Sequence, residues 1–427
     1  MLNTNNKIKR VKRFLLLMVI PLMFAANANA QNEFQTGSPY NIFGIGELNY
    51  ISSMRTSGMG IQGISLTGNY INNLNPASLS KLPYTTISVL FNYNFLKSSN
   101  GVQSASSSNG NAFGMNMGIP ISQEQGWSLA LGFNPYSLIN YKIVNDGFSI
   151  GEPIKETYAG RGGISKINIG MSYTLAKAVS LGFDYNYAFG DIKDLKLVEF
   201  TSQSGFTPTN IINENDYSGF YYKGGAIIDL EKLLKLKKSG EFTVGFLYES
   251  PLKLTAKFDG IYKTSLNTDT VTITRGDIEI PARLGFGITK KVGNRYLVSG
   301  DVLLQDWSTF KAYGLTQQNY QSAMRVGAGV EIQPLENADK TADKLTYRFG
   351  AFYETSYFTV NGESVNRMGI NAGIGIPLST YNSLDISLGY SMRGNTDNGL
   401  VKDNMLKLSA GLNFGELWFI RPKDEDR

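Results

Sequence analysis

The stretch Val179-Ser-Leu-Gly-Phe-Asp-Tyr-Asn-Tyr187 alternates large apolar side chains with small or polar ones. A period of two is typical of a β-strand, because successive side chains of a strand point to opposite faces of the sheet. The aromatic side chains share the apolar face, whereas Ser, Gly, Asp and Asn occupy the other face. This pattern predicts a strand of an outer-membrane β-barrel, with its apolar face toward lipid and its polar face toward the lumen.

The same alternation recurs in fifteen runs, which are 85–95, 111–120, 127–135, 165–174, 178–187, 220–229, 241–248, 254–264, 282–290, 295–304, 321–332, 345–353, 365–376, 384–391 and 405–414. Bacterial single-chain barrels have an even number of strands, so two of the runs must belong to one strand. We expect 241–248 and 254–264 to form that strand, kinked at Ser250-Pro251, and Thr270–Ile280 to pair with it. The sequence thus predicts an all-β fold, a transmembrane antiparallel β-barrel of about 14 strands over residues 83–415.

The lengths of the connections predict the orientation of the barrel. Short connections should face the periplasm; they follow Ser122, Thr174, Lys290 and Pro377. Long connections rich in Ser, Asn and Gly should lie at the cell surface; they are 96–110, 188–219, 305–320 and 392–404. Residues 416–427 follow the last strand and are expected to form a charged periplasmic tail.

Residues 1–30 have the three parts of a secretory signal peptide. A basic run from Lys7 to Arg13 precedes an apolar stretch, and Ala28-Asn29-Ala30 is a cleavage site of small residues. The chain has 40 Lys and Arg against 35 Asp and Glu, and five of the basic residues lie in this leader. The remainder is therefore neutral and has no general attraction to nucleic acid. We expect an exported protein in the outer membrane of a Gram-negative bacterium, surrounded by outer-membrane lipid, with no nucleic-acid partner.

The chain contains no His and no Cys. Their absence excludes Ser-His-Asp and Cys-His nucleophiles, His or thiolate metal sites, and disulfides. An outer-membrane lipase or protease is disfavoured for the same reason. We therefore expect a protein that is not an enzyme and that uses no cofactor and no metal.

Residues 31–82 lack the strand alternation and are rich in Gly, Asn and Ser, with scattered apolar positions. Within them, Gly58–Gly63 spells G-x-G-x-x-G, the dinucleotide-binding fingerprint. That motif requires a buried strand before it and a helix after it, and neither is predicted here. The segment is too apolar for a disordered tail. We expect residues 31–82 to form a hatch, a plug folded inside the lumen.

Two segments of this region resemble a known family. Arg55-Thr-Ser-Gly-Met-Gly-Ile-Gln-Gly63, followed by Asn75-Pro76-Ala77, resembles the N-terminal hatch of the long-chain fatty acid transporter (FadL/TodX) family. Asp301-Val302 with Asp306-Trp307-Ser308 resembles a later strand of that family, and the two ends of the mature chain resemble its Bacteroidota branch. The resemblance implies a fourteen-strand barrel, a hatch anchored at Asn75, Pro76 and Ala77, a hydrophobic pocket, and an inward kink in the third strand that opens sideways to the membrane.

The third strand is expected at Trp127–Pro135. Gly132 and Pro135 would weaken its ladder, because Gly has no side chain to pack and Pro lacks the N–H donor. They are the candidates for the lateral opening. The alternative is that Pro135 simply ends the strand at the outer rim of the barrel.

Candidate lumen or ligand residues are four arginines on the polar faces of the strands, Arg283, Arg325, Arg348 and Arg367. The last three lie on consecutive predicted strands. One interpretation is a cationic wall that meets an anionic ligand head. The other is a network of ion pairs that keeps the wall neutral and holds the plug. The acidic partners in that network would be Glu331, Glu354 and Asp385.

Two functions remain open from the sequence. The first is a channel for passive uptake of hydrophobic compounds such as long-chain fatty acids, with hydrophobic small molecules or lipids as its ligands. The second is a non-transporting accessory barrel, like PorV, of an outer-membrane protein export or assembly machine, with other outer-membrane or periplasmic proteins as its partners. The hatch favours the first function, and the long loops and the charged tail favour the second. A fold alone does not decide between them.

Overall fold

The computed structural model of the protein describes residues 37–417, with gaps at 203–206, 236–239, 264–267 and 336–337. The predicted signal peptide, residues 1–30, lies outside the described residues, as do residues 418–427 of the predicted tail. Within the described part of the chain, no helix is long and apolar enough to cross a membrane.

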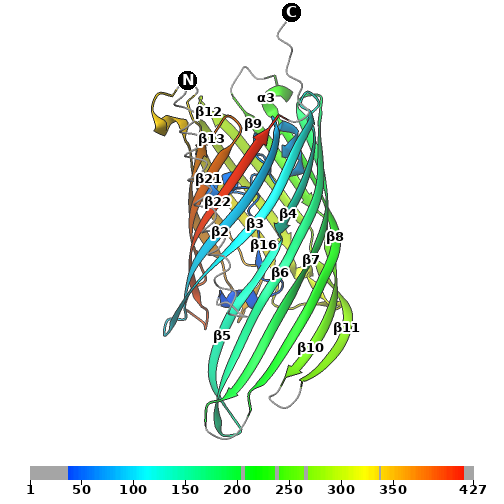
Figure 1. Ribbon diagram of the computed structural model, residues 1–427, viewed down its shortest axis with the longest axis vertical. Helices are drawn as coiled ribbons and strands as arrows, with labels where there is room; N and C mark the ends of the chain where they lie inside the picture. Colours follow the sequence, from blue (N-terminus) through cyan, green and yellow to red (C-terminus); the bar gives the residue numbers. More distant parts are fainter. Residues whose placement is uncertain (1–36, 203–206, 236–239, 264–267, 336–337, 418–427) are drawn as a thin grey trace, which may run out of the picture.

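The described chain forms a closed antiparallel barrel of 14 strands (Figure 1), as the alternation predicts. Three barrel strands are each made of two segments, so seventeen segments build the wall. In order these are β2 (Thr85–Ser99), β3 (Ser104–Ser122), β4 (Trp127–Pro135) with β5 (Ser137–Ser149), β6 (Glu152–Leu175), β7 (Val179–Phe200), β8 (Thr209–Asp229), β9 (Phe242–Glu249) with β10 (Leu252–Lys263), β11 (Thr268–Ile280) with β12 (Arg283–Val292), β13 (Tyr296–Asp306), β16 (Ser322–Ile332), β17 (Thr346–Glu354), β20 (Arg367–Pro377), β21 (Ser383–Arg393) and β22 (Lys402–Glu416). The first and last strands pair from Thr85↔Glu416 to Ser99↔Lys402, which closes the barrel. Closure leaves no edge in lipid, where unpaired backbone groups are costly.

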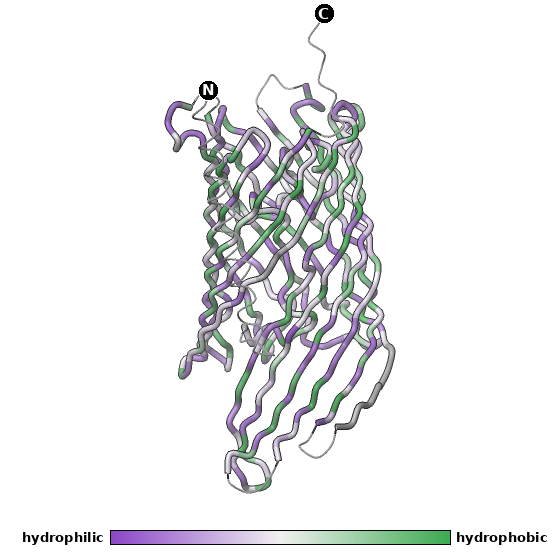
Figure 2. Tube along the Cα trace, viewed as in Figure 1, coloured by the Kyte–Doolittle hydropathy of each residue, from purple (hydrophilic) through white to green (hydrophobic). Residues whose placement is uncertain are grey.

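Apolar and polar residues alternate along the strands of the wall (Figure 2), and their side chains lie on opposite faces. On β7, the side chains of Phe183 and Tyr185 are 45% and 50% exposed on the outside, whereas Asp184 and Asn186 are buried on the inside. The apolar face can therefore contact lipid while the polar face lines the interior. This confirms the expected outer-membrane barrel.

The kink expected at Ser250-Pro251 is confirmed. The strand β9 ends at Glu249, β10 begins at Leu252, and β10 pairs with β11 from Leu252↔Ile280 onward. The Ser250 N–H donates to the Tyr222 carbonyl of β8 over 2.9 Å, so the ladder is kept up to the proline, which has no N–H to donate.

The prediction of surface loops at two places is wrong. Residues 96–110 and 188–219 are mostly strand, because β2 runs to Ser99, β3 starts at Ser104, β7 runs to Phe200 and β8 starts at Thr209. Residues 96–110 are mainly polar, and in 188–219 apolar and charged residues are mixed on both faces, so these parts lack the regular apolar alternation of the lipid-facing parts. They are held by cross-strand pairing and, in β7 and β8, also by side-chain contacts such as the Lys193–Glu214 ion pair of 2.8 Å.

As a result, the barrel is taller on one side (Figure 1). The strands β5, β6, β7, β8, β10 and β11 extend beyond the others at the lower end of the view. We call this the long-strand end and the opposite one the short-turn end. From the lengths of the connections, we expect the long-strand end at the cell surface and the short-turn end in the periplasm.

Four short elements of the N-terminal segment lie inside the barrel: η1 (Pro39–Ile42), β1 (Glu47–Leu48), α2 (Met54–Met59) and η2 (Pro76–Lys81). Every residue of 52–66 and of 70–80 is buried. The helix α2 begins at a capping box in which Ser53 and Thr56 bond each other's backbone N–H, and it ends at Gly60 with a φ of 66°. The expectation that the N-terminal segment folds inside the barrel is confirmed.

The lumen is capped toward the long-strand end by an aromatic cluster. Trp307 of η3 (Trp307–Thr309) stacks on Tyr357 with ring centroids 4.4 Å apart, and Phe43 of the hatch stacks on Phe358 at 4.5 Å. Loops of the wall and the start of the hatch thus share one apolar core. The remaining short elements are α3 (Leu230–Leu233), η4 (Thr341–Lys344), β14 (Lys311–Ala312), β15 (Leu315–Thr316), β18 (Thr359–Val360) and β19 (Glu363–Ser364).

Candidate functional site: the hatch and the cavities beside it

A buried ion-pair network joins the hatch to three strands of the wall. Arg55 of α2 binds Glu331 of β16 through two hydrogen bonds, from Nε to Oε2 over 2.7 Å and from Nη2 to Oε1 over 2.8 Å. Arg348 of β17 donates to the same Oε2 over 2.8 Å and to Asp385 of β21 over 2.5 Å. All four side chains are at least nine-tenths buried. Such charges are tolerated in an interior only when each one is paired and hydrogen-bonded.

Arg55 is held on its remaining sides as well. Its Nη1 donates to the Thr67 carbonyl over 2.8 Å, and its guanidinium lies 4.7 Å from the centre of the Tyr70 ring. Asp385 accepts a further bond of 2.7 Å from the Asn413 amide. The network therefore spans the lumen from the hatch to β22.

The G-x-G-x-x-G segment binds a carboxylate group of the barrel wall. The backbone N–H groups of Gln62 and Gly63 donate to the Asp301 carboxylate of β13 over 2.8 and 2.6 Å. Successive N–H groups in such a turn form a cradle for anions. Here the cradle is filled by Asp301, and within the described residues no strand leads into it, so the segment has neither the context nor the space of a dinucleotide site.

The motif Asn75, Pro76 and Ala77 starts η2 against the wall. The Asn75 side chain accepts from the Ala77 N–H over 3.1 Å and donates to the Ile64 carbonyl over 2.6 Å, so it links the two ends of the hatch. Two wall glycines make room for it. A Cβ at Gly225 would lie 1.9 Å from Asn75 Oδ1, and a Cβ at Gly182 would lie 2.2 Å from the Ala77 nitrogen.

The wall behind α2 is equally close. A Cβ at Gly329 would lie 2.3 Å from the Met59 carbonyl oxygen, and one at Gly350 would lie 1.8 Å from the same atom. No side chain larger than hydrogen fits at these positions. The hatch is therefore packed directly on the backbone of the barrel.

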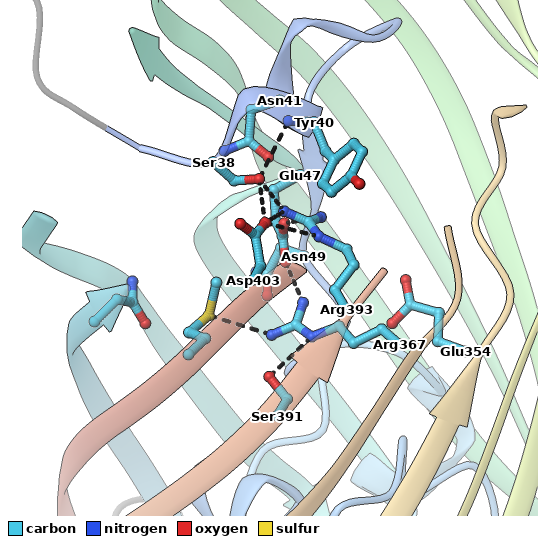
Figure 3. A network of polar contacts seen from close by, with 12 residues as sticks. Ser38, Tyr40, Asn41, Glu47, Asn49, Glu354, Arg367, Ser391, Arg393 and Asp403 are labelled. Carbon is cyan, nitrogen blue, oxygen red and sulfur yellow. Dashed lines mark hydrogen bonds and ion pairs between the residues drawn. The ribbon is translucent and has the colours of Figure 1, made fainter. Parts of the chain in front are cut away.

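A second polar network holds the start of the hatch toward the long-strand end (Figure 3). Glu47 of β1 pairs with Arg367 of β20 and with Arg393 of β21, the latter over 2.9 Å. Arg393 also binds Asp403 of β22 over 3.1 Å, and Asp403 accepts from the Ser38 hydroxyl over 2.5 Å. Burial by itself would raise the pKa of Glu47, but the two guanidiniums outweigh it and lower this pKa to about 2.

The four predicted arginines all point inward but do not form one wall. Arg348 belongs to the network at α2 and Arg367 to the network at β1. Arg325 pairs with Glu354 over 2.5 Å and lies 3.9 Å from the centre of the Phe352 ring. Arg283 lies 3.5 Å from Glu249 and takes part in neither network. These contacts are those that the ion-pair interpretation requires.

Two cavities flank the hatch. One, of about 1450 Å³, opens at the short-turn end and is lined by Arg55, Glu331 and Arg348, among others. The other, of about 510 Å³, is lined by Glu47, Arg325 and Arg367, among others. No residue lines both cavities. The helix α2 divides them, because its first residues face the larger cavity and its later ones face the smaller.

The third barrel strand is broken beside the smaller cavity. Pro135 ends β4, but the strand continues as β5, so the alternative that it stops at Pro135 is wrong. Between the two segments, Tyr136 turns into the core and donates its hydroxyl to Glu249 over 3.3 Å. Pro135 lines the smaller cavity. Gly132 lies within the paired ladder instead, where a Cβ would be 2.4 Å from Asn168 Oδ1.

Sequence reasoning missed the hatch side of both networks. Between residues 37 and 80, Glu47 and Arg55 are the only charged residues, which is a signal that could have found them. A buried charge in a plug needs a partner of opposite sign on the wall. Among the described residues, no group of three metal-ligating side chains occurs that could hold a metal ion.

Several solved structures share this architecture. A FadL homologue from Pseudomonas aeruginosa matches with a TM-score of 0.57 at 12% identity, over 88% of this chain and 100% of that one. The monoaromatic hydrocarbon channel CymD matches with a TM-score of 0.55 at 14% identity, over 88% and 100%. The toluene transporter TbuX of Ralstonia pickettii has a TM-score of 0.54 at 13% identity, over 86% and 100%. At such low identity the likeness concerns the fold, which is that of a FadL-like outer-membrane β-barrel of Gram-negative bacteria.

The sequence itself places the protein in a more specific group. The model of the BamG family matches residues 9–424, nearly the whole chain, and the protein therefore belongs to the BamG family. No curated protein matches the sequence. The resemblance of the hatch and strand motifs to the FadL/TodX family is thus a likeness of fold, and the family is BamG.

Proposed function

We propose that this protein is a non-transporting accessory subunit of the β-barrel assembly machinery in the outer membrane. Its family carries the name of a component of that machinery, and the family model covers the chain almost completely. Its partners would be other proteins of the same complex. Because a fold hosts many functions, the support must also come from the site.

The observation that carries the proposal is the division of the lumen by α2. A channel for small molecules needs a continuous path or a plug that moves. Here the two cavities share no lining residue, and the helix between them is held by four buried charges and by backbone-to-backbone packing. Opening such a plug would expose an uncompensated buried charge, which is strongly unfavourable.

The chemistry of the smaller cavity also supports this proposal. Ligand pockets for apolar molecules are lined mostly by hydrophobic and aromatic side chains. Seven asparagines line this one, namely Asn41, Asn49, Asn92, Asn94, Asn109, Asn140 and Asn371. Glu47, Arg325 and Arg367 line it too, so this cavity is richer in polar side chains than such a pocket usually is.

The proposal is tested by gentle purification of the tagged protein from native outer membranes, followed by quantitative mass spectrometry of proteins and lipids. We expect subunits of the assembly machinery at a fixed ratio to the tagged chain. Recovery of the folded barrel without protein partners, but with stoichiometric lipid or fatty acid, would overturn it.

A channel for hydrophobic compounds is the second candidate, and one observation favours it. The break between β4 and β5 places Pro135 on the smaller cavity, which is also lined by Phe189, a residue that stacks on the outward rings of Phe133 and Tyr187. Pro135 would then mark a lateral opening for a ligand, and Arg325 or Arg367 would meet its polar head. Uptake of labelled oleate by cells that lack the protein or carry Arg367→Ala tests this role, since a channel predicts loss in both.

A further inference from the structure

The strand β3 has a free edge on one half of its length. It pairs with β2 from Ser99↔Ser104 to Thr86↔Gly118, but it pairs with β4 only from Met115↔Phe133 onward. The next segment, β5, pairs with β6 and, within the described residues, not with β3. The segment Ser104–Gly110 therefore has one paired edge and one unpaired edge, which we call the β3 edge.

The strand β5, which follows β4 but within the described chain does not pair with β3, already has a short strand added to it. The hatch strand β1 pairs with β5 at Glu47↔Leu138 and Leu48↔Ser137, and Asn49 donates its N–H to the Tyr136 carbonyl over 3.0 Å. The chain thus covers the beginning of β5 with an extended segment of its own. The β3 edge has no such cover in the described part of the chain.

The β3 edge also lacks the features that keep other edges from pairing. Natural sheets protect an exposed edge with charges, proline, a bulge or shortness. The stretch Ser104-Ala-Ser-Ser-Ser-Asn-Gly110 has no charge and no proline, and it is seven residues long and regular. By contrast, β5 carries Lys142 and Asp146. An unprotected edge of this kind is a template for another strand.

The position of the β3 edge suits a partner near the outer surface of the membrane. Gly110 and Ser108 lie opposite Tyr93 and Phe95, whose outward aromatic rings mark the interface with the headgroups. Ser104, Ala105, Ser106 and Ser108 are exposed. The β2–β3 hairpin ends apart from the longer strands in Figure 1.

The inner face of β3 beside this edge shows which side chains a partner strand would contact. Asn109 lines the smaller cavity together with Asn92 and Asn94. A strand lying along the β3 edge would place every second side chain on this inner face, next to Asn109.

We propose that an extended segment of a second polypeptide adds to the β3 edge as a β-strand. Its backbone N–H and C=O groups pair with those of Ser104–Gly110, and its inward side chains lie beside Asn109 at the smaller cavity. This site deepens the proposed function by naming how a partner docks, but it does not depend on which complex the partner belongs to.

The test is photocrosslinking in living cells from the full-length protein. A photoreactive amino acid is placed at Ser106 and at Ser108 on the β3 edge, and at Phe95 and Leu388 as matched outward positions on sealed strands. We expect polypeptide adducts several-fold more abundant at the first two positions than at the controls. Adducts to lipid alone, or equal yields at all four positions, would overturn the proposal.

A second variant keeps the test independent of the crosslinker. Ser106→Lys places a protecting charge on the edge, and Asn100→Lys places the same charge on the neighbouring hairpin turn. With the reporter at Ser108, the first variant should abolish the polypeptide adduct and the second should retain it, while both barrels stay folded by heat-modifiability on gels. Retention of the adduct in both would refute strand addition.

These results separate the two proposals. If the tagged protein recovers the assembly machinery but the β3 edge gives no polypeptide adduct, the accessory function stands and strand addition fails. If the edge gives a polypeptide adduct but the tagged protein recovers no subunit of that machinery, strand addition stands and the proposed function is wrong.

Discussion

Replacing Glu331 by glutamine should loosen the hatch without removing any strand. Glu331 accepts three charge-assisted hydrogen bonds, two from Arg55 and one from Arg348, and its side chain is only 4% exposed. The amide can accept from one guanidinium but cannot neutralise either. Removing one partner from a buried ion pair costs about 3–5 kcal/mol. The effect here should lie near the lower figure, because Arg348 keeps Asp385.

The measurement is unfolding of the purified barrel by urea in detergent. Tryptophan fluorescence and the folded band on gels report the fraction that is still folded. Glu241→Gln is the matched control, because Glu241 also binds the hatch but accepts from the neutral Thr67 hydroxyl, over 2.9 Å. The glutamine oxygen can still accept from Thr67, so this change should cost less than the roughly 1.5–3 kcal/mol of a hydrogen bond to a charged group. We expect a clear fall in the midpoint for Glu331→Gln and a small one for the control.

A combined variant checks the reason for the effect. In Arg55→Met, Glu331→Leu, Arg348→Met, with Asp385→Asn added, all four buried charges are removed together, which is often neutral or stabilising for a buried cluster. This combined variant should recover much of the stability lost in Glu331→Gln, because no uncompensated charge stays buried. Equal midpoints for Glu331→Gln and Glu241→Gln would refute the argument that the shared carboxylate holds α2.

Three further predictions follow from the same contacts. Gly225→Val should destabilise the barrel by collision with Asn75, whereas Gly224→Val, which has nothing within 4 Å of its Cβ position, should not; comparing their unfolding temperatures checks this. Deleting Glu33–Leu74 should leave an assembled barrel that makes cells sensitive to large antibiotics, and an unchanged permeability barrier with a folded truncated barrel would contradict the plug. The stabilisation by Glu47, whose pKa is lowered from 4.5 to about 2, should be complete above pH 4.5 and lost as the pH falls toward 2, and a Glu47→Gln variant should lose less stability over that interval in thermal scans.

The sequence by itself determined the architecture of the barrel. Alternation with a period of two, as in Val179–Tyr187, identifies strands that contact lipid on one face, and the rule of even strand number locates the kink at Ser250-Pro251. Both depend on local patterns, because the two-residue period of a strand is set by its own backbone geometry. For the same reason, the outer parts of β3 and β7 carry no strand signal, since no lipid imposes a regular apolar face on them.

Only the tertiary structure decided what the hatch does. Arg55 and Arg348 are 293 positions apart in the chain and share the carboxylate of Glu331, and the turn at Gln62–Gly63 meets Asp301 across the lumen. The sequence indicates that such charges are buried, but it does not show which of them pair. Their pairing depends on the register of each strand and on how deeply the hatch is inserted into the lumen. The break between β4 and β5 and the unpaired half of β3 have the same origin. They arise where the chain turns inward at Tyr136 and one strand loses its neighbour, which no periodicity records.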